Sequence, residues 1–303
     1  MPQKINIPEP EPNLKFIDVH CHMPFPRPKN DRLPTNQEQY SNYFKMGGQY
    51  LISSTIDIHT LNITLEFMKE NSRNFGFTVG WAPQTVTYTP KEKYDSDWKM
   101  WLDFINNNQE KYLAIGEIGL DFHHAKNLEK RNRQIEVFKQ ILDISQHFNK
   151  PYIFHVRNAA EHEFDRKNPK HRFNKKDGSN KEILKIIEEF KINPDRIMWH
   201  CFSGPEDYGR TLPSQGYTLS VPSSAYGFER WRNVTKFSPL DSLVTETDSY
   251  YQHPYKRGPI NVPSNARYAI AAIAFSHKVS QKTVSEKTVE NAISFFNLKI
   301  EEF

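Results

Sequence analysis

Short apolar runs rich in β-branched and aromatic residues alternate along the chain with longer segments in which apolar residues recur every three or four positions. The short runs predict eight strands: Lys15–His20, Tyr50–Ile56, Phe75–Gly80, Leu113–Glu117, Tyr152–His155, Ile197–His200, Tyr217–Val221 and Ser242–Glu246. Strands that alternate with helices are typical of parallel βα units in an α/β protein. Eight such units predict a single (β/α)8 TIM barrel, whose functional site lies at the C-terminal ends of the strands.

The longer segments predict helices, among them Leu128–Phe148, Glu182–Phe190, Val262–Ser276 and Val284–Phe296. In the first of these, the apolar residues are spaced by about one or two helical turns, which gives one apolar face. No linker or internal repeat divides the sequence. We therefore expect one domain over residues 1–303.

Composition and charge narrow the class of protein. The chain has 303 residues, 37% of them hydrophobic and 13% aromatic, which excludes a disordered protein. The net charge of +4 excludes neither nucleic acid nor small anions as partners. The longest apolar run, Ala269–Phe275, is too short to cross a membrane. Two cysteines and the absence of a signal peptide predict a cytoplasmic protein without a disulfide framework.

Histidines and carboxylates follow or end several of the predicted strands. The first strand ends in FIDVHCH, where strand alternation places His20 and His22 on one face and turns Cys21 to the other. Later strands end in, or are closely followed by, four further residues of this kind: Glu117, His155, His200 and Asp248. Each of the last three lies about one βα unit after the residue named before it. Since the C-terminal strand ends form one ring in a barrel, we expect these six side chains to converge.

This set of side chains has the composition of a metal centre. Imidazole nitrogen favours Zn, Co, Ni or Fe, and carboxylate oxygen also admits Mn or Mg. Two divalent ions would leave a positive centre for an anionic substrate or a hydroxide. Ions about 3.5–4 Å apart can stabilise both the attacking and the leaving oxygen, so hydrolysis is the reaction class that the residues favour.

The motifs FIDVHCH, AIGEIGLDF, PYIFHVRNA, IMWHCFSG and LVTETDSYY, in this order, together resemble those of the TatD family of metal-dependent deoxyribonucleases, which are barrels of the amidohydrolase type. The resemblance implies that His20, His22 and Asp248 bind one divalent ion, that His155 and His200 bind a second, and that Glu117 bridges the two. It also implies that Asp248 orients or deprotonates the attacking water, so Asp248 and Glu117 are the expected catalytic residues.

The same resemblance implies activity on single-stranded or frayed DNA ends, often as a 3′-to-5′ exonuclease, with Mg, Mn, Zn or Co as the metal. No membrane and no obligate protein partner are expected. One position departs from the family: a glycine, a variable residue and His-Pro commonly follow its third strand, and this chain has Ala82 in place of the histidine. This departure affects the expected positioning of substrate or water. A proline-rich loop from Met23 to Gly48 and a basic loop from Arg166 to Lys181 are expected around the mouth of the site.

Several further residues have two interpretations. Arg157 could bind a phosphate or form a salt bridge, and His123 and His124 could bind phosphate or a third metal, or be surface residues. The basic loop could contact DNA or be only solvated. Cys21 and Cys201 could donate a thiolate, but alternation is expected to turn them away. Aromatic residues beside the motifs could stack on a base or pack in the wall: Trp81, Phe202, Tyr250 and Tyr251.

Two other functions remain open on the sequence. A barrel of the amidohydrolase type could hydrolyse a small amide, ester or lactone, although Glu117 stands where several such enzymes use a modified lysine. A catalytically degenerate barrel could bind nucleic acid or a partner without turnover, which Ala82 alone favours and the complete set of six ligands opposes.

Overall fold

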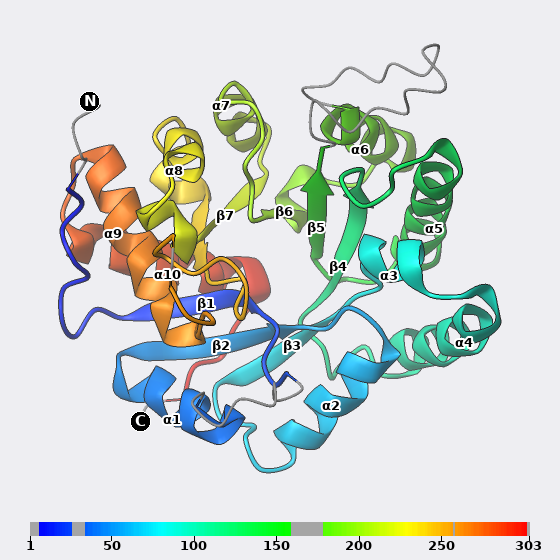
Figure 1. Cartoon of the computed structure of the whole chain (residues 1–303), viewed down its shortest axis with the longest axis horizontal. Helices are drawn as coiled ribbons and strands as arrows, with labels where there is room; N and C mark the ends of the chain where they lie inside the picture. Colours follow the sequence, from blue (N-terminus) through cyan, green and yellow to red (C-terminus); the bar gives the residue numbers. More distant parts are fainter. Residues whose placement is uncertain (1–5, 26–33, 159–177, 257, 302–303) are drawn as a thin grey trace.

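The computed structural model describes residues 6–25, 34–158, 178–256 and 258–301. Eight parallel strands lie in sequence order in one sheet, β1 to β8, with helices around their outside (Figure 1). They are β1 (Phe16–Cys21), β2 (Gly48–Ser54), β3 (Phe75–Val79), β4 (Ala114–Asp121), β5 (Tyr152–Arg157), β6 (Ile197–His200), β7 (Thr218–Pro222) and β8 (Leu243–Glu246). The predicted TIM barrel is confirmed.

The seam between β8 and β1 closes the barrel through side chains and loop backbone. The Thr245 hydroxyl donates to the Ile17 carbonyl (2.7 Å), and the Asp248 amide donates to the His20 carbonyl (2.9 Å). Asp18 is completely buried there and accepts hydrogen bonds from the amide and the hydroxyl of Thr247. The seam therefore brings the loop after β8 beside the end of β1.

Ten α-helices are present in the described residues. They are α1 (Asn36–Lys45), α2 (Ile58–Met68), α3 (Pro83–Tyr88), α4 (Lys91–Asn107), α5 (Leu128–Ser145), α6 (Gly178–Phe190), α7 (Tyr208–Ser214), α8 (Glu229–Thr235), α9 (Ala266–His277) and α10 (Gln281–Phe296). The four helices predicted by residue range are all found. The predicted Val262–Ser276 begins late, at Ala266, because a 3-10 turn from Pro263 precedes it.

The apolar core has two parts. The larger lies between the strands and the surrounding helices. The smaller fills the barrel interior near the strand starts, where Ile17, Ile153 and Val244 pack with Ala292 and Phe296 of α10. Helix α10 thus closes the N-terminal end of the barrel and leaves the C-terminal end for the site.

The expected loop from Met23 to Gly48 was wrong in part, because α1 lies within it. Thr35 and Glu38 form a capping box: the Thr35 hydroxyl accepts from the Glu38 amide (3.1 Å), and the Glu38 carboxylate accepts from the Thr35 amide (2.6 Å). Only Gln39 and Tyr43 of this helix are buried, so its apolar signal in the sequence is weak. Residues 26–33 lie outside the described part.

Most of the expected basic loop, residues 166–177, also lies outside the described residues. Its last four residues were wrongly assigned to a loop, since α6 begins at Gly178. The Ser179 amide donates to the Asn158 side chain (2.8 Å), which ties this helix start to the end of β5. No helix of the described residues is long and apolar enough to span a bilayer.

Candidate metal centre

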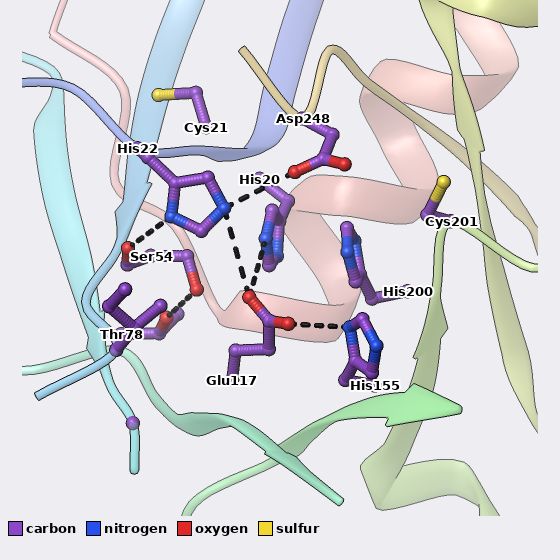
Figure 2. A network of polar contacts seen from close by, with 12 residues as sticks. His20, Cys21, His22, Ser54, Thr78, Glu117, His155, His200, Cys201 and Asp248 are labelled. Atoms are coloured by element: carbon purple, nitrogen blue, oxygen red, sulfur yellow. Dashed lines mark hydrogen bonds and ion pairs between the residues drawn. The ribbon is translucent and has the colours of Figure 1, made fainter. Parts of the chain in front are cut away.

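Six side chains converge at the C-terminal end of the barrel (Figure 2). His20 lies in β1 and His22 in the loop that follows it. Glu117 lies in β4, His155 in β5 and His200 in β6, and Asp248 is the second residue after β8. Sequence analysis predicted this convergence. The structure brings the six together, and their assignment as metal ligands remains a prediction.

Glu117 lies between the other residues. Its Oε2 is 3.5 Å from Nε2 of His20 and 3.7 Å from Nε2 of His22, while Oε1 is 2.6 Å from Nδ1 of His155. One carboxylate therefore faces two groups of imidazoles, as a bridging ligand would. Burial by itself would raise the pKa of Glu117, but the charges and hydrogen bonds of the histidines outweigh it and hold that pKa well below its usual range.

Two sets of side chains have ligand atoms close enough to hold an ion. One is His20, His22 and Asp248, with Nε2 of His22 3.2 Å from Oδ1 of Asp248. The other is His20, Glu117 and His200, and the rings of His20 and His200 stack at 3.6 Å. The first set matches the predicted first metal. The second differs from the prediction, because His20 takes the place there that sequence analysis gave to His155.

The histidine nitrogens that face Glu117 fit a metal. Nε2 of His20 and Nδ1 of His155 are buried and lie 3.5 Å and 2.6 Å from the Glu117 carboxylate, but neither makes a hydrogen bond of good direction. A cation between these nitrogens and the carboxylate would satisfy both without requiring hydrogen-bond geometry. Nitrogen and carboxylate oxygen together are the donor set of divalent first-row metals.

Each of three imidazoles engages a partner through its other nitrogen. Nδ1 of His200 lies 2.9 Å from Oε2 of Glu246, Nε2 of His155 lies 3.0 Å from Oδ2 of Asp121, and Nδ1 of His22 lies 3.0 Å from the Ser54 carbonyl. Such partners fix the ring orientation and tautomer of metal-bound histidines.

Sequence analysis missed both carboxylates of this outer layer, Glu246 and Asp121. Each is completely buried. The signal was an acidic residue at the end of an otherwise mostly apolar strand, since an unpaired carboxylate is rarely buried. The Ser220 hydroxyl donates to Glu246 (2.6 Å), so that carboxylate is held from two sides.

The carboxylates also determine the protonation of the imidazoles. Burial lowers the pKa of His155, but the charges of Glu117 and Asp121 outweigh it and raise the pKa to about 10. For His200, burial is likewise outweighed by Glu246, and the pKa rises to about 9. The pKa of Asp248 is lowered, because a hydrogen bond from His22 outweighs burial. Asp248 is therefore ionised at neutral pH and able to accept a proton.

Two glycines permit close approach of the strands around Glu117. Gly119 has φ +136°, and a side chain there would collide with the His155 carbonyl. A side chain at Gly80 would collide with the backbone of Glu117. The strand that carries Glu117 runs four residues beyond its predicted end, to Asp121, and these glycines allow it to pack between its neighbours.

Ala82, which replaces the family histidine, is buried and precedes α3. Two residues further on, Gln84 lies in the cavity of the site. Its amide donates to Oδ2 of Asp121 (2.9 Å) and lies 3.3 Å from Nε2 of His155. The polar side chain of Gln84 thus faces the His155 side of the centre, although Ala82 replaces the histidine that is common in the family.

A cavity of about 600 Å³ opens above the centre, and it includes some of the other predicted residues. Arg157 and His124 line it, and Nδ1 of His124 is 2.8 Å from Oδ2 of Asp121. His123 does not line the cavity, and its ring lies edge-on against His124 at 5.0 Å. The substrate roles expected of these residues remain predictions.

The cysteines differ from each other. Cys21 is buried, and its thiol donates to the Ile52 carbonyl, as alternation predicts. Cys201 lines the cavity, because β6 ends at His200 and Cys201 adopts φ +46°, which breaks the alternation. Burial raises the pKa of both thiols well above the usual range. Among the described residues, neither sulfur belongs to a group able to hold a metal.

The aromatic candidates separate by burial. Trp81 and Phe202 are buried and form part of the core. Tyr250 and Tyr251 line the cavity, with ring centroids 4.5 Å apart, and Phe25 lies 4.6 Å from Tyr250. Tyr251 is 55% exposed, so its side chain is accessible to a ligand in the cavity.

The barrel and its convergent histidines and carboxylates define a metal-dependent hydrolase class, which comparison with known proteins supports. The sequence profile of the TatD related DNase family matches residues 17–297. The chain therefore belongs to the TatD family of metal-dependent hydrolases.

Individual relatives agree with this assignment. An uncharacterized metal-dependent hydrolase of Methanocaldococcus jannaschii is 26% identical over 95% of this chain and 99% of its own. The human deoxyribonuclease TATDN3 is 28% identical over 64% of each chain. Among solved structures, the TatD homologue YjjV of Escherichia coli superimposes with a TM-score of 0.72 at 20% identity, covering 94% of this chain and 98% of its own. A TatD family hydrolase of Entamoeba histolytica gives 0.73 at 17% identity, covering 94% and 99%.

Proposed function

We propose that this protein is a two-metal phosphodiesterase that degrades DNA from single-stranded or frayed ends, as a 3′-to-5′ exonuclease. The observation that carries the proposal is the position of Glu117, one carboxylate between two sets of imidazoles. Two adjacent cations suit in-line displacement at phosphorus, where both the attacking and the leaving oxygen carry charge.

The residues divide into two groups around that carboxylate. His20, His22 and Asp248 would hold one divalent ion, and His155 and His200 the other, with Glu117 shared. When bound, such ions polarise the phosphoryl oxygens and lower the pKa of an attacking water towards neutrality. Asp248, ionised at neutral pH, accepts the proton of that water. A bond forms between the water oxygen and phosphorus, and the bond from phosphorus to the sugar oxygen of the leaving group breaks.

The cavity wall supports a nucleotide rather than a small ester. Tyr250 and Tyr251 beside the centre offer aromatic faces, and base–aromatic stacking contributes about 1–3 kcal/mol per base without sequence preference. The human relative is named a deoxyribonuclease, which points to the same substrate class.

Degradation of a single-stranded oligonucleotide labelled at its 5′ end tests the proposal. Metal-stripped protein would receive Mg, Mn, Zn or Co singly, with the Glu117→Gln variant as control. We expect stepwise shortening from the 3′ end that requires both metal and Glu117, and a loss of at least about a hundredfold in the variant at unchanged fold. Retained turnover in folded Glu117→Gln protein would refute the site assignment.

Two other outcomes would replace the proposed function. Hydrolysis of lactones or amides without any action on oligonucleotides would identify a small-substrate hydrolase. Oligonucleotide binding without turnover under every metal would identify a non-catalytic binding barrel. The basic residues Lys170, Arg172, Lys175 and Lys176 lie outside the described residues, and their contact with DNA stays a prediction.

A further inference from the structure

Two arginines line the cavity beside the metal centre without being part of it. Arg157 ends β5, two residues after His155, and Arg230 lies in the first turn of α8. Ser203, three residues after His200, lines the same wall. These three side chains flank the six proposed ligands, and sequence analysis had singled out only Arg157.

Arg230 is held in place by two contacts. Its Nη2 donates to the Ser203 hydroxyl oxygen at 3.0 Å, and its guanidinium carbon lies 4.1 Å from the centre of the Trp231 ring. Because the Ser203 oxygen accepts this hydrogen bond, the hydroxyl proton remains available to a ligand. A guanidinium stacked on a ring and fixed by a hydrogen bond loses little entropy when it binds an anion.

The two guanidiniums share the cavity without a counter-ion. In the described part of the chain, neither forms an ion pair with a carboxylate, and both side chains are exposed to the cavity. Burial lowers the pKa of Arg230, Cys201 opposes this effect, and the like charge of Arg157 in the same cavity lowers the pKa, so the two cations repel each other. An anion between them would replace this repulsion by attraction, and planar guanidinium groups match phosphate oxygens.

We propose that Arg230, Ser203 and Arg157 form a binding site for a second phosphate of the substrate, one that is not cleaved. The substrate is thus a nucleotide chain with a phosphate next to the scissile one. That the substrate is a nucleotide rests on the proposed function. The phosphate site itself rests on the two guanidinium groups and the Ser203 hydroxyl.

A substrate truncation combined with a substitution tests this site. The thymidine dinucleotide TpT has one phosphate, whereas pTpT and TpTp each carry an additional one. We expect the metal-loaded wild-type protein to prefer at least one of the longer probes over TpT in kcat/KM by about tenfold to a hundredfold, the effect of one charge-assisted hydrogen-bonded contact. Arg230→Gln should reduce this preference to within about twofold and leave kcat/KM for TpT nearly unchanged.

Arg210→Gln is the matched control. Arg210 is also exposed and stacks on an aromatic ring, with its guanidinium 4.3 Å from the Phe237 centre, but it does not line the cavity. It should keep the wild-type preference. An equal loss on TpT and on the longer probes in Arg230→Gln would place Arg230 at the scissile phosphate and overturn the proposal, as would an unchanged preference.

A binding measurement separates this site from the proposed function. If the wild-type protein cleaves no nucleotide, fluorescence anisotropy with a labelled single-stranded DNA 10-mer still applies to the metal-loaded protein. Weaker binding by Arg230→Gln, with a salt slope lower by about 0.7, would retain the phosphate site while the nuclease proposal fails. Equal affinity and slope in the two proteins, or no binding by either, would overturn the site.

Discussion

At the scale of single residues, the centre depends on two carboxylates that are not themselves proposed metal ligands but hold two of the ligand histidines in orientation. Glu246 and Asp121 each engage the outward nitrogen of one imidazole, so that the opposite nitrogen points inward. Figure 2 shows this inward convergence of His155 and His200 towards Glu117. The ring orientation of a histidine is therefore decided one layer outside the centre.

Glu246→Gln tests this layer. The amide keeps the shape and can still accept a hydrogen bond, but it removes the charge that makes His200 a stronger ligand. We expect metal affinity to fall about tenfold to a hundredfold. The metal-free protein should also lose stability at pH 7.5, because the protonated His200 loses its buried counter-charge. Titration calorimetry with Zn or Mn measures the affinity, and the exposed Glu229→Gln serves as control. Equal affinities in the two variants would show that Glu246 has only a structural role.

At the scale of elements, the barrel separates stability from chemistry. Helix α10 packs Ala292 and Phe296 into the interior near the strand starts, whereas the proposed ligands lie at the strand ends. Among the described residues, none of the six proposed ligands belongs to the cluster that packs against α10, so packing changes at one end should leave the other intact.

Phe296→Ala should destabilise the protein strongly without changing its site. Phe296 is 4% exposed, and removal of a buried phenylalanine costs about 3–5 kcal/mol. Urea denaturation measures the loss, and metal affinity at low temperature should stay within about twofold. Phe275→Ala on α9 is the control, since Phe275 is 42% exposed and should cost less than about 1 kcal/mol. A comparable loss in both variants would contradict the role of α10 as a closure of the barrel.

At the scale of the whole molecule, five strands and their loops meet to concentrate charge in one buried centre. Two of its imidazoles, His155 and His200, carry raised pKa values because the nearby carboxylates outweigh burial, whereas burial and the charge of His200 lower the pKa of His20. In the metal-free protein at pH 7.5, His155 and His200 are therefore protonated, since their pKa values of about 10 and about 9 lie above that pH. A metal can bind these nitrogens only after the protons leave.

Metal uptake should consequently release about two protons per chain at pH 7.5. The sign follows from the raised pKa values: the free protein holds these protons, so lower pH favours it over the metal-bound form. Affinity should rise between pH 6 and pH 8. Calorimetry in buffers of different ionisation enthalpy counts the protons. A proton count near zero would show that the two imidazoles are neutral before the metal arrives.

The sequence by itself determined the order of strands, the barrel class and the residues at the strand ends. Each of these depends on local pattern: apolar runs mark strands, and the polar residue that ends an apolar run is visible in the chain. The same rule failed where the pattern is weak, as in α1, whose start depends on a capping box and not on an apolar face.

Only the tertiary structure decided which side chains share a space. Several such groupings join residues far apart in sequence: the pairing of Asp121 with His155, the grouping of His20 with both sets, the position of Gln84, and the presence of Arg230 and Arg157 in one cavity. Strand alternation fixes the face on which a residue lies, but distances across a barrel follow from register, tilt and loop path. These depend on packing throughout the molecule, which no local pattern contains.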